Sequence, residues 1–167
     1  MIAFESLRKD HLPLVREWLQ REHVRRWWRE PADSLAEYEA AIEGREPTDH
    51  YLIVLDGHPI GLIETYLTAD YPESEEIVRV GPGVAGVDFL IGEQELTGQG
   101  LGPELIRAFV DRVVFADPGV HACVATPEEA NRRSWRAFEK AGFQYVRDVE
   151  EKGLPHRLMR LDRSYAQ

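Results

Sequence analysis

The chain has 167 residues, 43% of them apolar, which suits a single domain with a hydrophobic core. Asp and Glu outnumber Lys and Arg by 30 to 20, and the formal net charge of −10 argues against nucleic acid and favours a cationic small-molecule partner. The single cysteine, Cys123, excludes an internal disulfide. No apolar run approaches the roughly 20 residues of a membrane span, and no charged-then-apolar leader opens the chain, so we expect a cytoplasmic protein without a membrane partner. Monomer and homodimer both stay open.

The first quarter of the chain combines one strand pattern with three helical ones. Residues 2–7 alternate apolar and polar as in a half-buried strand, and Asp10 is placed to cap the helix that follows. Further helical patterns lie around residues 24–28 and over residues 34–44, where apolar side chains share one face. These patterns predict a group of helices after a first strand.

The middle of the chain changes to a period of two. Residues 51–55 and 59–67 are typical of strands, and the Asp-Gly turn between them predicts an antiparallel pair. Residues 70–76 are rich in glutamate, and we expect them to form a solvated acidic loop.

The second half of the chain alternates strands and helices. The expected strands and helices, ending in a hairpin, are residues 84–91, 101–114, 121–125, 131–141, 143–149 and 156–161. A strand, a crossover helix and a second strand imply a parallel pair joined in the right-handed sense. The sequence therefore predicts an α/β (α+β) fold.

A glycine-rich segment, Gly98-Gln99-Gly100-Leu101-Gly102, separates the strand at residues 84–91 from the following helix. Glycines let the backbone turn sharply beside a ligand, and a helix start adds unpaired N–H donors, so the segment can cradle a phosphate. A P-loop is excluded because Pro103-Glu104 stand where a lysine and a hydroxyl residue are needed. A dinucleotide fingerprint fits poorly because its third glycine falls on Pro103, and a plain tight turn is the structural alternative.

Together with residues 131–143 (NRRSWRAFEKAGF), the glycine segment resembles the GNAT superfamily of N-acetyltransferases. Their pyrophosphate loop reads Arg/Gln-x-x-Gly-x-Gly/Ala, and their next helix starts with Asn and ends in Glu-Lys-x-Gly-Phe. The resemblance spans residues 84–143. It implies one GNAT acetyltransferase domain over residues 1–167, with a central mixed, mostly antiparallel sheet, a parallel pair around the CoA cleft, and flanking helices. It also implies acetyl-CoA as cosubstrate and no metal.

The resemblance assigns acetyl-CoA binding to the end of the central strand, the glycine segment and the Asn-led helix. These residues are Phe89, Leu90, Ile91, Gly98, Gln99, Gly100, Leu101, Gly102, Asn131, Ser134 and Lys140. Two positions depart from the family. Thr97 stands where the family often has Arg or Gln, and Phe138 stands where many relatives have a tyrosine that protonates the leaving thiolate. Ser134 is the remaining, weak candidate for that proton.

Within the superfamily, Trp27-Trp28 and residues 83–88 (GVAGVD) resemble the aminoglycoside 6′-N-acetyltransferases. In that branch the aspartate that corresponds to Asp88 lies beside the acceptor amine, which implies a catalytic role. A carboxylate can hold an ammonium and accept its proton. Because an aspartate pKa lies about six units below that of an alkylammonium, we expect Asp88 to orient the cation and accept the proton through water, with burial raising its pKa. A plain solvent-facing position on the strand is the alternative.

The acceptor site is expected to combine aromatic rings with negative charge. Its candidate residues are Trp27, Trp28, Glu64, Tyr66, Asp88 and Thr126. Only one of the adjacent tryptophans can face the ligand, so the other is expected in the core. Thr126 stands where the branch often has an acidic residue, and packing or surface roles are the alternatives for Glu64 and Tyr66.

Cys123 lies in an apolar strand pattern without a clear histidine partner, which argues against a covalent mechanism. The sequence therefore predicts direct acetyl transfer to a primary amine of a cationic small molecule, foremost the 6′-amine of an aminoglycoside antibiotic. A polyamine, a siderophore hydroxylysine or a peptide amine stays open as acceptor. A non-catalytic acyl-CoA-binding module is the further alternative.

Overall fold

The computed structural model describes residues 1–164. The strands are β1 Ile2–Ser6, β2 Thr48–Leu55, β3 His58–Leu67, β4 Val84–Ile91, β5 Ala122–Ala125, β6 Gln144–Glu151 and β7 Leu154–Asp162. They are ordered β1-β2-β3-β4-β5-β7-β6 in a seven-stranded sheet. β4 and β5 run parallel, whereas β1 pairs antiparallel with β2, and β7 with β5 and β6. The predicted mixed sheet with a parallel pair is confirmed.

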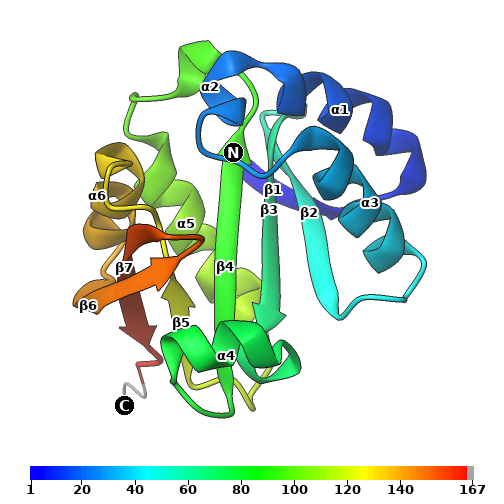
Figure 1. Ribbon diagram of the computed structural model, residues 1–167. Helices are drawn as coiled ribbons and strands as arrows, with labels where there is room; N and C mark the ends of the chain where they lie inside the picture. Colours follow the sequence, from blue (N-terminus) through cyan, green and yellow to red (C-terminus); the bar gives the residue numbers. More distant parts are fainter. Residues whose placement is uncertain (165–167) are drawn as a thin grey trace. The chain divides into compact units, whose positions relative to one another are not determined.

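The helices occur in the segments that connect these strands along the chain (Figure 1). They are α1 Leu12–Gln20, α2 Glu22–Arg25, α3 Pro31–Ile42, α4 Pro72–Val78, α5 Leu101–Arg112 and α6 Arg132–Lys140. Short 3-10 turns occur at Lys9–His11, Thr68–Asp70, Gln94–Leu96 and Val114–Ala116. No helix within residues 1–164 has both the length and the apolar character needed to cross a membrane.

Backbone contacts divide the chain into two compact units. The first unit consists of Met1–Thr65 and Asp88–Thr97, and the second of Tyr66–Val87 and the chain from Gly98 onward. Because the boundaries fall inside β3 and β4, both strands contribute residues to each unit. The expectation of one domain over the whole chain stays a prediction.

The core of the first unit forms where α1 and α3 pack against each other and α3 packs against β2. α1 carries Val15, Trp18 and Leu19 at helical spacing on one buried face. Leu52 and Val54 alternate along β2 and point into the same apolar cluster. This packing holds α3 against β2 and α1 against α3.

Three boundaries in the first unit differ from expectation. Asp10 does not cap a helix, because it lies in a 3-10 turn with its carboxylate 3.1 Å from Arg8 Nε, and α1 begins at Leu12. α2 ends at Arg25, so the two tryptophans lie in the turn that follows it. α3 begins earlier than predicted because Pro31, with its fixed φ, suits a first helical turn.

The prediction of an acidic loop at residues 70–76 is wrong, because α4 occupies most of it. Pro72 stands in the first turn, and Arg79, in the left-handed region at φ 49°, ends the helix. The Glu75 carboxylate accepts hydrogen bonds from the Thr68 hydroxyl at 3.2 Å and from the Gly81 amide at 3.1 Å. One of the supposed loop glutamates is thus a structural residue.

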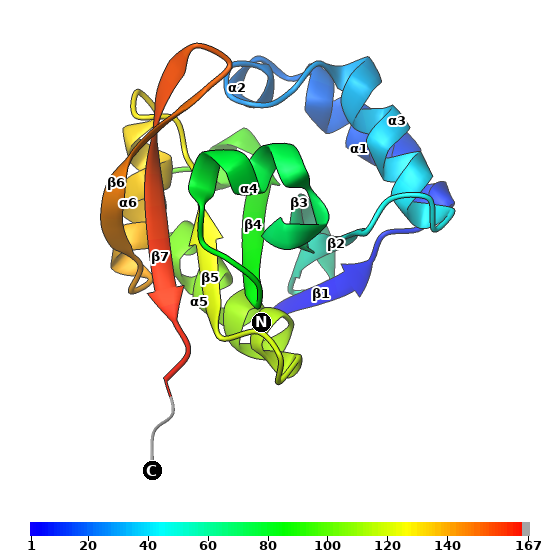
Figure 2. The same ribbon diagram turned by 60° about the horizontal axis from the view of Figure 1, so that its bottom comes forward.

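The second unit has helices on both faces of its strands (Figure 2). Val78 of α4 packs with Ala122 and Val124 of β5 on one face. α5 and α6 pack together on the other, where α5 buries the apolar side chains Leu105, Ile106, Phe109 and Val110. The helix predicted at residues 131–141 is present as α6, and Asn131 is its N-cap.

Candidate active site

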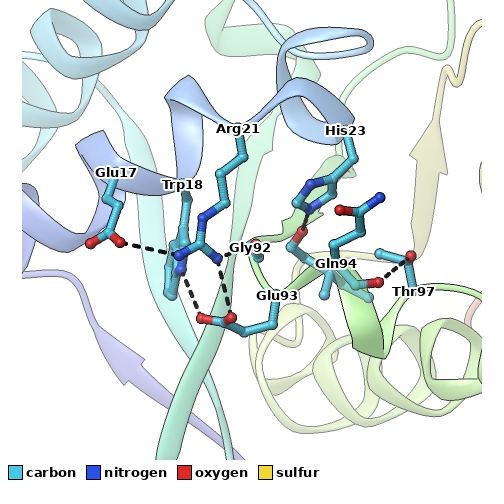
Figure 3. A network of polar contacts seen from close by, with 9 residues as sticks. Glu17, Trp18, Arg21, His23, Gly92, Glu93, Gln94 and Thr97 are labelled. Carbon is cyan, nitrogen blue, oxygen red and sulfur yellow. Dashed lines mark hydrogen bonds and ion pairs between the residues drawn. The ribbon is translucent and has the colours of Figure 1, made fainter.

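The end of β4 is held in place by side chains of the first unit (Figure 3). His23 Nε2 lies 2.9 Å from the Ile91 carbonyl oxygen. Arg21 Nη1 donates to the Gly92 carbonyl at 2.8 Å and to the Glu93 carboxylate at 3.1 Å. The segment that leaves β4 is therefore anchored at consecutive residues.

Gly92 is required at this anchor by close packing. A Cβ atom there would lie 2.3 Å from the Trp18 ring, so any other side chain would displace the indole. The Trp18 ring N–H in turn donates to Glu93 at 3.4 Å. Next to this anchor, Leu90 is buried, while Phe89 and Ile91 are half-buried. These are the residues whose backbone is predicted to bind the pantetheine arm.

A charged cluster surrounds the guanidinium of Arg29 in the same unit. Arg29 Nη2 donates to Glu64 Oε1 at 2.9 Å, and Nη1 lies 3.7 Å from Asp88 Oδ2. Nε lies 3.4 Å from Glu37 Oε2. The guanidinium stacks over the Trp28 ring, 4.6 Å from its centroid. One cation thus faces three carboxylates and one indole.

Burial and charge determine the ionisation of this cluster. Burial alone would lower the pKa of Arg29, but the Glu64 and Asp88 carboxylates raise it above its ordinary value, so the guanidinium stays charged. Burial raises the pKa of Glu64, and the Arg29 cation and its hydrogen bond oppose that change. With a guanidinium at 2.9 Å, we assign Glu64 as a carboxylate.

His50 lies behind Glu64 and is neutral at pH 7. Burial, and secondarily the charge of Arg29, lower the pKa of His50 to about 4. Its Nε2 is 3.7 Å from Glu64 Oε1, a contact that is consequently no ion pair near neutral pH. The His50 ring meets the Tyr38 ring edge-on at 4.7 Å, and Tyr38 accepts a hydrogen bond from the Trp28 ring N–H at 2.8 Å.

Asp88, the predicted catalytic residue, differs from expectation in its burial. Half of its side chain, 50%, is exposed, where we expected burial to raise its pKa. Its Oδ1 accepts a hydrogen bond from the Phe89 backbone amide at 2.9 Å, which fixes the rotamer. The carboxylate is therefore oriented and half-exposed.

The structure gathers only some of the predicted acceptor residues. Trp28 packs against the core of the first unit and joins Glu64 and Asp88 around Arg29, whereas Trp27 lies beside Arg26, whose guanidinium is 4.9 Å from its ring. Both rings are half-buried in different surroundings, and which of them faces an acceptor stays a prediction.

Tyr66 and Thr126 belong to the second unit. A Cβ atom on Gly86 would lie 2.4 Å from the Tyr66 ring, so the ring fills the space beside that glycine. Thr126 directly follows β5 and is half-buried. Their roles toward an acceptor stay predictions.

The glycine segment in the second unit combines two structural demands. Gly98 and Gly100 have φ values of 76° and 77°, a region that favours glycine, and Gly100 is the N-cap of α5. Gly102 is needed for packing instead, because a Cβ atom there would lie 3.2 Å from the Ala137 Cβ of α6. A Cβ atom on Gly100 would meet nothing within 4 Å. Open space beside a helix start fits the pyrophosphate that the sequence predicts here.

The Asn-led helix carries two of the predicted cosubstrate residues at its opposite ends. The Asn131 side chain accepts a hydrogen bond from the Ser134 amide at 3.4 Å, so it serves as a cap. Lys140 is exposed at the opposite end of the nine-residue helix, about 13 Å along its axis, so these two residues cannot share one phosphate. Their assignment to the cosubstrate stays a prediction.

Two side chains of the second unit can be excluded from proton transfer. Phe138 is buried with its ring 5.1 Å from Phe143 and carries no acidic group. Cys123 is fully buried, and burial raises the pKa of its thiol, which agrees with the structural role predicted for it. Among residues 1–164, no three His, Cys, Asp or Glu side chains are grouped to hold a metal ion.

Sequence reasoning missed two arginines, Arg29 and Arg133. The Arg133 guanidinium lies beside the glycine segment, with Nη2 3.4 Å from the Cβ position of Gly98. The sequence signal for Arg133 was the pair Arg132-Arg133 in the first turn of a helix. The helix dipole disfavours cations there unless an anion binds. Arg29 gave only a weak signal, a cation directly after two tryptophans.

Comparison with known proteins agrees with these features. The relatives include aminoglycoside N(6')-acetyltransferase type 1 of Klebsiella pneumoniae, 32% identical over 149 residues, which are 86% of this chain and 74% of the relative. N(6)-hydroxylysine O-acetyltransferase of Escherichia coli is 26% identical over 153 residues, 86% of this chain and 45% of that protein.

Among solved structures, aminoglycoside acetyltransferase AAC(6')-Ib in complex with coenzyme A and kanamycin has a TM-score of 0.88 at 31% identity, covering 98% of this chain and 95% of that one. Residues 8–151 match the family model described as an acetyltransferase (GNAT) domain. With this match over most of its length, the chain belongs to the GNAT family of acetyltransferases.

Proposed function

We propose that the protein transfers the acetyl group of acetyl-CoA directly to a primary amine of a cationic aminosugar, with the 6′-amine of an aminoglycoside as the favoured acceptor. The observation that carries this is the oriented, half-exposed carboxylate of Asp88 in the last part of β4, which shares the Arg29 guanidinium with Trp28. The relative that is 32% identical and named for N(6') acetylation supports the choice of acceptor. So does the similar structure in complex with coenzyme A and kanamycin.

Acetyl-CoA, when bound, supplies the thioester that is attacked. The glycine segment, residues 98–102, would hold its pyrophosphate through backbone N–H groups, with Arg133 adding positive charge. The backbone of Phe89, Leu90 and Ile91 would bind the pantetheine arm. The Arg21 and His23 contacts at the end of β4 keep that backbone fixed.

Asp88 would act on the acceptor amine. An amine is protonated at neutral pH and must lose a proton before its lone pair can attack. The Asp88 carboxylate attracts and orients the ammonium, with Oδ1 fixed by the Phe89 amide, and receives the proton through water. Attraction of the ammonium by the negative charge of Asp88 contributes more than proton transfer to it, because a carboxylate is a much weaker base than the amine.

The leaving thiolate is expected to depart without a side-chain acid. Phe138 has no proton to give, and Cys123 is buried. A free thiol has a pKa of about 8.5, so the thiolate is a good leaving group near neutral pH. Direct transfer therefore needs no acyl-enzyme.

The test is release of CoA thiol with a pair of kanamycin-type acceptors that differ only in the 6′-amine. We expect release with the 6′-amino compound, and mass and positional analysis should find one acetyl group at that nitrogen. Equal release with both members of the pair would contradict the 6′ assignment, and no release with either would contradict the choice of acceptor class.

A hydroxylysine acceptor is the second candidate, because the E. coli N(6)-hydroxylysine O-acetyltransferase is also a relative. The chain spans less than half of that relative. The family resemblance implies a histidine in siderophore acyltransferases at the position of Asp88, which counts against this acceptor. A product from N(6)-hydroxylysine that neutral hydroxylamine cleaves would favour it, because esters are cleaved and amides are not.

A further inference from the structure

A resident cation already occupies the carboxylates expected to receive the acceptor. The Arg29 guanidinium stacks over Trp28 at 4.6 Å and faces Glu64, Asp88 and Glu37. An aromatic face rimmed by carboxylates is also what a protein offers to a ligand ammonium. The acceptor must therefore bind beside Arg29 or compete with it.

The contacts of Arg29 with its two main partners are unequal. Its distance to Glu64 is 2.9 Å, and only 8% of the Glu64 side chain is exposed. Its distance to Asp88 is 3.7 Å, and 50% of that side chain is exposed. Because a short contact away from water is electrostatically stronger, the guanidinium is anchored on Glu64 rather than on Asp88.

The backbone around Arg29 does not itself fix this choice. Arg29 lies in the stretch between α2 and α3, outside both helices. His50, neutral at pH 7, adds no competing charge next to Glu64. Glu37 and the Trp28 ring also contact the guanidinium, and Glu64 makes the shortest and most buried of its ion pairs.

We propose that Glu64 is a positioning residue that holds the Arg29 cation 3.7 Å from Asp88, beyond hydrogen-bonding distance, so that the half-exposed Asp88 carboxylate can still attract the acceptor ammonium. Arg29 then determines specificity, because it fills one cation position and leaves the other to the acceptor. This inference rests on the proposed function for its kinetic consequence. It differs from the prediction that Glu64 binds the acceptor itself.

The decisive variant is Glu64→Gln, which keeps an oxygen acceptor of the same size and removes the charge. Arg29 should then shift to Asp88 and compete with the acceptor. We expect the KM for the acceptor to rise about tenfold, the loss of one charge-assisted contact. The KM for acetyl-CoA should stay unchanged.

The double variant Arg29→Gln/Glu64→Gln separates the two roles of Glu64. If Glu64 only positions Arg29, removing the cation as well should lower the acceptor KM back toward that of the parent. If Glu64 binds the acceptor directly, the KM should stay as high as in the single variant, and the proposal is overturned.

Glu43→Gln and Glu43→Gln/Arg45→Gln are the matched controls, because this glutamate–arginine pair, at 2.8 Å, lies on the surface of the same unit. Both should leave the acceptor KM unchanged. Thermal unfolding of every variant checks that the proteins with substitutions in the buried cluster still fold.

A crystal structure of the Glu64→Gln variant tests the same displacement without any acceptor. We expect an Arg29 nitrogen within about 3 Å of the Asp88 carboxylate, the usual length of a charge-assisted hydrogen bond. An unchanged Arg29 position would overturn the proposal even if aminoglycosides are acetylated. If no aminoglycoside is acetylated, the proposed function fails, and this structure still decides the role of Glu64.

Discussion

At the level of single residues, Asp88 combines a hydrogen bond that fixes its rotamer with a half-exposed side chain. Asp88→Asn keeps the shape and the Phe89 contact but removes the charge that attracts the ammonium. We expect kcat/KM for the amine to fall at least about tenfold, while the CoA dissociation constant is unchanged. Asp10→Asn, at an exposed aspartate paired with Arg8, is the control. An unchanged rate in Asp88→Asn would remove this residue from the chemistry.

Arg29 also affects stability, because it compensates a buried carboxylate. Arg29→Met leaves Glu64 buried without its cation, which typically costs about 3 to 5 kcal/mol of unfolding free energy. Arg29→Met/Glu64→Gln should recover most of that loss, since no charge is then left unpaired. Urea unfolding of both variants measures the difference. A single variant as stable as the parent would show that Glu64 does not need the Arg29 cation for its burial.

His50 predicts a pH dependence of stability. Its pKa falls from 6.5 to about 4 in the folded protein, mainly through burial, so the unfolded chain binds the proton more readily. The stabilisation is complete above pH 6.5 and is lost as the pH falls toward 4, by about 3 kcal/mol in all. Urea unfolding at pH 7 and near pH 4 should show this loss in the parent. It should be smaller in His50→Gln, and an equal loss in both would contradict the assignment.

At the level of elements, the glycine segment before α5 allows a matched test of the cosubstrate site. Gly100 and Gly153 have φ values of 77° and 76°, and a Cβ atom on either meets nothing within 4 Å. Alanine should therefore cost similar backbone strain at both, about 1 kcal/mol. Only Gly100→Ala should weaken CoA binding, by about tenfold or more, because its Cβ occupies the space where the phosphate must approach. Calorimetric titration with CoA measures both variants.

Equal affinities in the two glycine variants would show that the loop does not hold the pyrophosphate. Weakening in both would point to a general loss of folding, which thermal unfolding can detect. The comparison therefore separates backbone strain from loss of a binding surface.

Local patterns predicted the strands and long helices because each repeats one period over many residues. They failed where a few residues decide whether a short segment is helical or where a helix ends. Pro72 and the left-handed Arg79 turn an acidic stretch into α4, and the helix before Trp27 ends earlier than its apolar spacing suggests. Propensity is weak over such short segments, and tertiary contacts such as Glu75 with Gly81 decide the outcome.

The candidate site was predictable only in part. The glycine segment and Asp88 are local motifs, so the sequence alone was enough to propose them as site residues. The Arg29 cluster was not predictable, because its partners Glu37, Glu64 and Asp88 come from different elements and meet only after the unit has folded. Their local surroundings in the sequence carry no common period or spacing.

At the level of the whole molecule, the net charge of −10 has opposite effects on the two substrates. A polycationic acceptor is attracted at long range, whereas the phosphates of acetyl-CoA are repelled. Glu75 contributes to this field but is tied to the fold, while Glu73 and Glu76 of α4 are exposed to solvent. The attraction is therefore a property of the whole surface rather than of one loop.

Salt should separate these two effects. Raising NaCl from about 0.05 to 0.5 M shortens the screening length from over 10 Å to below 5 Å. The kcat/KM for a kanamycin-type acceptor should then fall severalfold, and that for a monoamine should fall less. The kcat/KM for acetyl-CoA should stay constant or rise, because screening weakens its repulsion. Parallel decreases for all three substrates would instead indicate that salt acts on the fold, and would remove long-range attraction as the basis for preferring polycations.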